Sequence, residues 1–86
     1  MITRKQTAAK IADYLQRRIN LEELAEWAEN AIMEEELEEE YFHELRDIIS
    51  RLGLADVREF GLTWEDCEDY LRRLGYNITV EISEAV

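Results

Sequence analysis

Glu39, His43 and Asp47 are the residues whose types and spacing come nearest to a chemical site. They stand four positions apart, so on one helix they line a single face with nitrogen and oxygen ligands suited to a divalent metal ion. Chance produces the same spacing in a glutamate-rich helix, where such a histidine is simply solvated. We therefore predict no bound metal or other cofactor, and these three residues are the candidates if a metal binds.

Catalytic chemistry has little support in the sequence. His43 is the only histidine and Cys67 the only cysteine, and Cys67 falls within an apolar stripe. A nucleophile needs a base beside it and donors for an oxyanion, and neither is evident here. Pairs of carboxylates carry little information in a chain with so many of them. The sequence predicts a protein that is not an enzyme, and its single cysteine excludes an internal disulfide.

The stretch "EEELEEEYFHEL", residues 34–45, opens with six glutamates in the seven positions 34–40. Residues 22–44 hold eleven glutamates, and no lysine or arginine stands between Arg18 and Arg46. The whole chain carries 10 basic and 21 acidic residues, a net charge of −11, so all of the excess lies in this stretch. Such a field repels nucleic acid and anionic membranes and speeds the encounter with a basic partner.

This acidic stretch has two interpretations, a solvated helix junction or a docking face. A docking face of this size suits a protein better than a small ligand, which predicts a non-enzymatic module that binds a basic partner protein, with no nucleic acid and no membrane as partner. The alternatives are a small regulatory protein with a weak divalent-metal site and a structural homodimer. The candidate partner-binding residues are Glu22, Glu26, Glu29, Glu34, Glu35, Glu38 and Glu39.

Helix-forming patterns position these residues within a single domain of 86 residues. Thr3, Asn20 and Thr63 each precede an apolar period of three to four residues and are followed three positions later by Gln, Glu or Asp, as in capping boxes. The apolar stripe changes phase at residues 33–37, and a break there relieves repulsion between glutamates four apart. The predicted helices span about residues 4–19, 21–33, 38–52 and 63–74.

Two shorter features complete the predicted fold. The piece "LADVREFG", between Gly53 and Gly61, is expected to form one or two helical turns. In the tail, residues 77–83, apolar and polar residues alternate as in a half-buried strand. The expected fold class is thus all-α, a compact four-helix bundle with a short extra helical turn and a C-terminal β-strand. The candidate partners of the strand are the N-terminal "MIT", the loop around Val57, the partner protein or, the favoured choice, a second subunit in a homodimer.

Large apolar residues at helical spacing are expected to face the core. They are Trp27, Tyr41, Phe42, Phe60, Trp64 and Cys67. The first predicted helix carries five basic residues against Asp13 alone, a net charge of +4, and we expect it to complement the acidic second and third helices. The N-terminus "MITRKQTAAKIADYL" has no continuous apolar core, so we expect neither a signal peptide nor a membrane span, and a cytoplasmic location.

The helical pattern, the acidity and the segment "INLEELAEWAENAI" together resemble bacterial immunity proteins of the colicin D type, over about residues 11–52. The resemblance implies a helical protein whose acidic surface occupies the basic, RNA-binding cleft of a ribonuclease toxin. The counterparts by charge and placement are Glu34, Glu35, Glu38 and Glu39. Immunity proteins against DNase colicins are also small and acidic, but their tyrosine-tyrosine-proline element is missing from this proline-free chain. An uncharacterised family of small bacterial proteins fits equally well.

Overall fold

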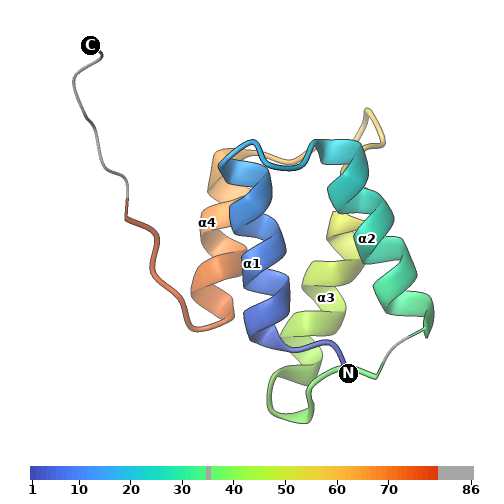
Figure 1. The fold of residues 1–86 in the computed structure, drawn as a ribbon, viewed down its shortest axis with the longest axis vertical. Coiled ribbons are helices and arrows are strands. Elements are labelled where there is room, and N and C mark those ends of the chain that lie inside the picture. Colours follow the sequence, from blue (N-terminus) through green and yellow to red (C-terminus); the bar gives the residue numbers. More distant parts are fainter. Residues whose placement is uncertain (35, 80–86) are drawn as a thin grey trace.

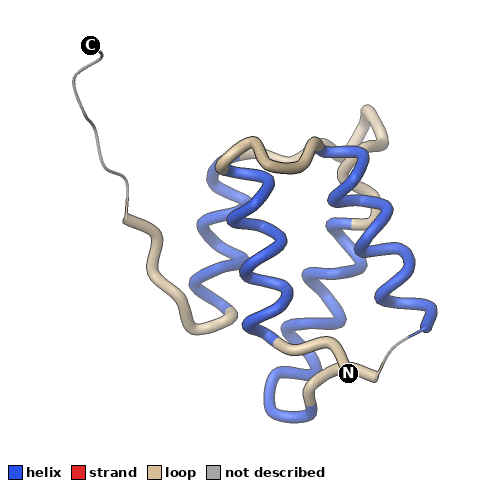
Figure 2. Tube along the Cα trace, in the orientation of Figure 1, coloured by secondary structure: helices blue, strands red, loops and turns tan. Residues whose placement is uncertain are grey.

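The computed structural model describes residues 1–34 and 36–79 and arranges most of them in four α-helices (Figure 1). The predicted mainly helical class is confirmed, and within the described ranges no residue belongs to a strand of a sheet (Figure 2). The helices are α1 Arg4–Leu15, α2 Leu21–Glu34, α3 Phe42–Leu52 and α4 Trp64–Arg73, with a 3₁₀ turn, η1 Glu39–Tyr41, before α3.

The predicted capping residues begin three of the helices. The Thr3 hydroxyl accepts a hydrogen bond from the first turn of α1. Before α2, the Glu23 N–H donates to the Asn20 side chain at 2.8 Å, and the Glu23 carboxylate accepts from the Asn20 N–H at 3.2 Å. Thr63 and Asp66 form the same reciprocal pair before α4. Each pair satisfies two backbone donors that would otherwise lack a partner, so short polar sequences fix where these helices start.

α1 ends at Leu15 and not near residue 19. Arg17 adopts a φ of 62°, and the Arg17 and Arg18 N–H groups donate back to the carbonyls of Tyr14 and Asp13 at 3.0 and 2.8 Å. This is a Schellman ending, which usually places glycine at the left-handed position. The apolar residues continue at helical spacing to Ile19. Ile19 nevertheless lies in the turn between α1 and α2 and packs against the core from there.

All four helices contribute to one core. α2 and α3 form the most extensive helix pair, and α1 packs against α2, α3 and α4. The side chains that are wholly buried include Ile11, Leu24, Leu45, Ile48, Ile49, Leu52, Cys67 and Leu74. Burial of Cys67 agrees with its predicted position. The core holds the ends of the helices in place, and those ends carry the surfaces described below.

Three aromatic residues predicted to face the core are instead exposed. Phe42 is 40% exposed, Phe60 66% and Trp64 44%, whereas Trp27 and Tyr41 are half-buried against the core as expected. Phe42, directly after the 3₁₀ turn, and Trp64 are the first residues of α3 and α4 and so lie at the ends of the bundle. Phe60 lies in the connection between α3 and α4. The helical spacing was correct, but the ends of the helices lie beyond the core.

The connection between α3 and α4 and the described part of the C-terminal tail form neither helix nor strand. Residues 53–61 form successive turns, in which Val57 accepts from the N–H groups of Phe60 and Gly61 at 2.9 and 3.1 Å. The described part of the tail, residues 76–79, is not a strand, and residues 80–83 of the predicted strand lie outside the described residues. The pairing of that strand, including the homodimer, therefore stays a prediction. The N-terminal "MIT", one of its candidate partners, pairs elsewhere.

Candidate functional site

The acidic segment, residues 34–40, separates α2 from α3, as the change of phase in the apolar stripe predicted. α2 ends at Glu34, and the next helical turn is η1, which starts at Glu39. α3 itself begins at Phe42, later than the predicted residue 38. The glutamates 39 and 40 occupy the 3₁₀ turn, so the N-terminal end of this helical region carries negative charge, as the helix dipole favours.

Backbone hydrogen bonds join the acidic segment to the N-terminus. Ile2 and Leu37 form a parallel bridge, in which the Ile2 N–H donates to the Glu36 carbonyl at 2.7 Å and the Glu38 N–H donates to the Ile2 carbonyl at 2.8 Å. The Ile2 side chain is only 5% exposed and belongs to the core. A segment full of like charges is thus held in place by two backbone bonds and one buried aliphatic side chain.

Arg4 adds a second connection at this end of the bundle. Its backbone N–H, in the first turn of α1, donates to a Glu38 carboxylate oxygen at 3.0 Å. Its guanidinium donates to the Leu74 carbonyl at 3.0 Å and lies over the rings of Tyr41 and Tyr76, at 4.9 and 5.2 Å from their centroids. Glu38, a predicted partner-binding residue, therefore has a half-buried structural role at the N-terminus of α1.

The expected charge complementarity between α1 and the acidic helices is not a set of side-chain ion pairs. Where side chains are described, no lysine or arginine of the first sixteen residues lies within ion-pair distance of a carboxylate on α2 or α3. Arg18 pairs with Asp13 at 3.5 Å, and the Arg4 guanidinium donates to the Leu74 carbonyl. Lys10 of α1 does line one small hollow together with Glu23 and Glu26 of α2, so the charges adjoin there without forming an ion pair.

An apolar hollow opens beside the acidic segment. It has a volume of about 630 Å³. Its walls are Met1, Ile32, Leu37 and Phe42, and its rim includes Glu36, Glu39 and Arg46. We call it the acid-rimmed hollow. Ile32 and Phe42 are each 40% exposed and Met1 is 70% exposed, and the neighbouring Met33 is 77% exposed. A gathering of exposed large apolar side chains marks an interaction surface, and methionine adapts its shape to varied partners.

Among the predicted partner-binding glutamates that the structure describes, Glu39 lines this hollow and three others lie along α2. Glu22, Glu26 and Glu29 are exposed and recur on one face of α2, the helix that leads to the acidic segment (Figure 1). Glu39 is at the rim. The description does not include the side chain of Glu34 or any part of Glu35. Glu36 was not among the predicted site residues.

The apolar walls were also missed, although the sequence holds a signal for them. "IM" stands directly before the glutamates and "YF" directly after, so apolar residues flank the acidic segment on both sides. Tyr41 and Phe42 were expected to face the core, and this holds for Tyr41 but not for Phe42. One residue of each flanking pair, Ile32 and Phe42, lines the same hollow as Leu37, which pairs with Ile2.

The metal candidates are not brought together. Glu39 lies in the 3₁₀ turn, so the four-residue helical spacing to His43 is lost. His43 is exposed with its ring at the edge of Phe42, and Asp47 accepts hydrogen bonds from Arg51 at 3.0 Å and Arg73 at 2.9 Å. These bonds, Arg51 first, hold the pKa of Asp47 below its ordinary value. Within residues 1–34 and 36–79 no group of three His, Cys, Asp or Glu side chains is arranged to hold a metal ion.

Cys67 is placed to be unreactive. Burial raises the pKa of its thiol from 9.0 to about 11, and the neighbouring Asp66 carboxylate acts in the same direction. A thiol attacks as the thiolate, so a buried, protonated sulfur has little nucleophilicity at neutral pH. Cys67 is a packing residue of α4.

Comparison of the chain with protein-family models, with curated proteins and with solved structures finds no match. The site must therefore be interpreted from its own geometry. None of the helices in the described ranges is both long enough and apolar enough to cross a bilayer. What the geometry offers is a shallow apolar surface with acidic edges.

Proposed function

We propose that this protein is a non-enzymatic binding module that docks on a basic partner protein through the acid-rimmed hollow. The observation that carries the proposal is the coincidence of two features at one place. Exposed apolar side chains, Ile32 and Phe42 among them, lie next to the segment with the highest density of negative charge in a chain of net charge −11. Charge alone is compatible with a solvated surface, whereas exposed apolar walls gain free energy when a partner covers them.

The two features have different roles in binding. Exposed ion pairs contribute about 0 to 1 kcal/mol each, so the glutamates mainly speed association and set orientation. Retention comes from the apolar walls, because covering apolar surface yields roughly 25 cal/mol per Å². The partner that fits has a large apolar side chain to insert between Ile32 and Phe42, with lysine or arginine beside it to meet Glu36 and Glu39.

A basic nuclease domain is one partner class with this chemistry. A cleft that binds RNA must present cationic side chains, and an acidic surface can occupy it in place of the phosphates. This is the immunity-type or antitoxin-type function that the sequence resemblance implied. The exposed α2 glutamates Glu22, Glu26 and Glu29 extend the negative surface beyond the hollow and suit a partner larger than one peptide.

Affinity capture with matched variants tests the proposal. The bait is the full chain, and the two site variants are Glu36→Gln with Glu39→Gln and Ile32→Gln with Phe42→Gln. The controls carry the same chemistry elsewhere, namely Glu59→Gln with Glu65→Gln, and Leu54→Gln, which alters a side chain that is 46% exposed.

We expect a basic protein to be captured by the unmodified chain and by both controls. The apolar site variant loses it, and the acidic site variant captures it more slowly and only at low salt. Capture that is unchanged in both site variants, or lost equally in the controls, would contradict the proposal. Thermal melting of each bait shows that the variants remain folded.

A further inference from the structure

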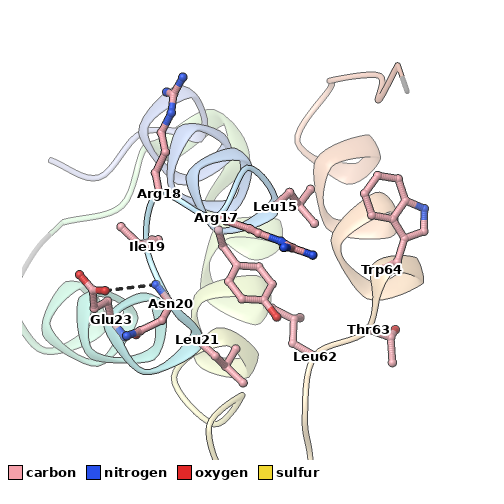
Figure 3. A pocket seen from close by; sticks show the side chains of 11 residues that line it. Leu15, Arg17, Arg18, Ile19, Asn20, Leu21, Glu23, Leu62, Thr63 and Trp64 are labelled. Carbon is pink, nitrogen blue, oxygen red and sulfur yellow. Dashed lines mark hydrogen bonds between the residues drawn. The ribbon is translucent and has the colours of Figure 1, made fainter. Parts of the chain in front are cut away.

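A second hollow lies at the end of the bundle away from the acidic segment, where α1 ends and α4 begins (Figure 3). It has a volume of about 680 Å³. Tyr14 and Leu15 of α1, Leu62 and Trp64 next to the start of α4, and Arg17 of the connecting turn contribute to its lining. We call it the aromatic hollow. Trp64 is 44% exposed, although tryptophan offers a large apolar surface that folding usually covers.

Arg17 holds an unfavourable backbone conformation at this hollow. Its φ of 62° lies in the left-handed region, where a side chain crowds the backbone and glycine is the usual occupant. The turn needs this φ to end α1, but it does not need an arginine. In Figure 3 the Arg17 side chain extends across the hollow in the direction of Trp64. Strain that a simple substitution could relieve is frequent at functional positions.

Arg18 and Glu23 at the aromatic hollow have partners within the described ranges, whereas the Arg17 guanidinium has none. Arg18 pairs with Asp13 at 3.5 Å, and the Glu23 carboxylate accepts from the Asn20 N–H at 3.2 Å, the dashed line of Figure 3. The Arg17 guanidinium has no hydrogen bond or ion pair with any residue in the described ranges. An available cation therefore stands beside exposed aromatic surface, in a chain whose net charge is strongly negative.

We propose that the aromatic hollow binds an acidic segment of a partner protein, with a large apolar side chain against Tyr14, Leu62 and Trp64 and a carboxylate on the Arg17 guanidinium. Tryptophan, tyrosine and arginine are the residues most enriched where binding energy concentrates. A guanidinium also binds a carboxylate with two parallel hydrogen bonds, which fixes orientation. The occupant is selected by charge complementarity, since the lining holds two cations, Arg17 and Arg18, against the single carboxylate of Glu23. This surface is independent of the acid-rimmed hollow and selects the opposite charge.

The test is a titration with a short acidic peptide, acetyl-Glu-Phe-Leu-Glu-amide, followed by two-dimensional amide and indole NMR of the full chain. The glutamine version of the peptide is the matched control. We expect saturable shifts at the Trp64 indole and the Leu62 amide, with at least tenfold weaker binding of the glutamine peptide. Signals of the acid-rimmed hollow, such as Phe42, should not move.

Arg17→Gly separates a binding role from a structural one, because the two roles move opposite readouts. Relief of the left-handed strain raises the melting temperature by roughly 2 to 5 °C. The same variant should bind the acidic peptide at least tenfold more weakly, while Arg17→Lys, which keeps a cation, loses less. Unchanged affinity in Arg17→Gly would show that the residue only forms the turn. Absence of binding, equal binding of the two peptides, or shifts centred elsewhere would equally overturn the proposal.

Discussion

The two ends of the bundle carry hollows of similar size, one lined by Glu36 and Glu39 against Arg46 and the other by Arg17 and Arg18 against Glu23. The acid-rimmed hollow has about 630 Å³ and an exposed Phe42, and the aromatic hollow has about 680 Å³ and an exposed Trp64. They differ in how the fold holds them. The acidic end is fastened by the Ile2 bridge and by Arg4, whereas the other end depends on a turn with Arg17 in a left-handed conformation. The net charge of the chain therefore conceals a division of the surface into two regions.

The largest expected effect comes from loosening the acidic end at its buried residue. Ile2→Ala removes most of a side chain that is 5% exposed, which should destabilise the protein by about 2 to 4 kcal/mol. Urea denaturation measures the change. Met33→Ala is the control, since that side chain is 77% exposed and its loss should cost less than about 0.5 kcal/mol. Equal effects of the two variants would mean that the N-terminus does not anchor the acidic segment.

The core that both ends share should make stability sensitive to alkaline pH. The pKa of the Cys67 thiol is raised from 9.0 to about 11, so the folded protein holds this proton more tightly than the unfolded chain. The resulting stability is complete below about pH 9 and is lost as pH rises from about 9 to 11, in total roughly 3 kcal/mol. Tyr70, whose pKa burial also raises, adds in the same direction. Denaturation between pH 8 and 11 measures the slope, and Cys67→Ala should flatten it; an equal slope in that variant assigns the effect to other groups.

Removing the Arg4 side chain should weaken the acidic end by less. Arg4→Ala loses the bond to the Leu74 carbonyl and two ring contacts, and we expect a cost of about 1 to 2 kcal/mol. Lys5→Ala, one position along α1 at an exposed residue, should change stability by less than about 0.5 kcal/mol. If both substitutions cost the same, the contacts of Arg4 contribute nothing beyond its place on the helix.

The smallest expected change in stability distinguishes two neighbouring glutamates, Glu38 and Glu39. Glu38→Gln weakens a charged acceptor at the N-terminus of α1 and should cost about 0.5 to 1 kcal/mol. Glu39→Gln, at the exposed rim, loses only a favourable interaction with the helix dipole and should cost less than about 0.5 kcal/mol, while it weakens partner binding. Thermal melting of the pair distinguishes a structural carboxylate from a surface one. A larger loss in Glu39→Gln would reverse the assignment.

Local chemistry allowed much of the fold to be predicted from the sequence. Capping pairs such as Thr63 with Asp66 are short-range, and the structure contains them as expected. The break in the acidic segment followed from a phase change and from like-charge repulsion, which are also local. The end of α1 was misplaced because Arg17 adopts a conformation that residue type disfavours. No pattern of residue types indicates a left-handed arginine.

The candidate sites depended on contacts that sequence patterns do not contain. Helical spacing assigned Phe42 and Trp64 to the core. Each is the first residue of its helix, and a side chain there lies beyond the neighbouring helices that would cover it. The hollow around Phe42 forms because Ile2 and Leu37, far apart in the sequence, pair across the bundle end. A long-range contact of this kind decides which apolar residues share a surface. Charge density alone indicated the region but not its walls.

The central claim is that a basic partner docks at the acid-rimmed hollow and not over the acidic surface in general. The most direct measurement is an NMR titration of the full chain with a basic amphipathic peptide, acetyl-Lys-Leu-Leu-Lys-Lys-Phe-Leu-Lys-amide. We predict saturable shifts centred on the amides of Ile32, Leu37 and Phe42, with the Trp64 indole unmoved, and their loss in the variant with Ile32→Gln and Phe42→Gln. Shifts that follow every exposed glutamate alike, and that disappear with moderate salt without involving the hollow, would contradict the claim.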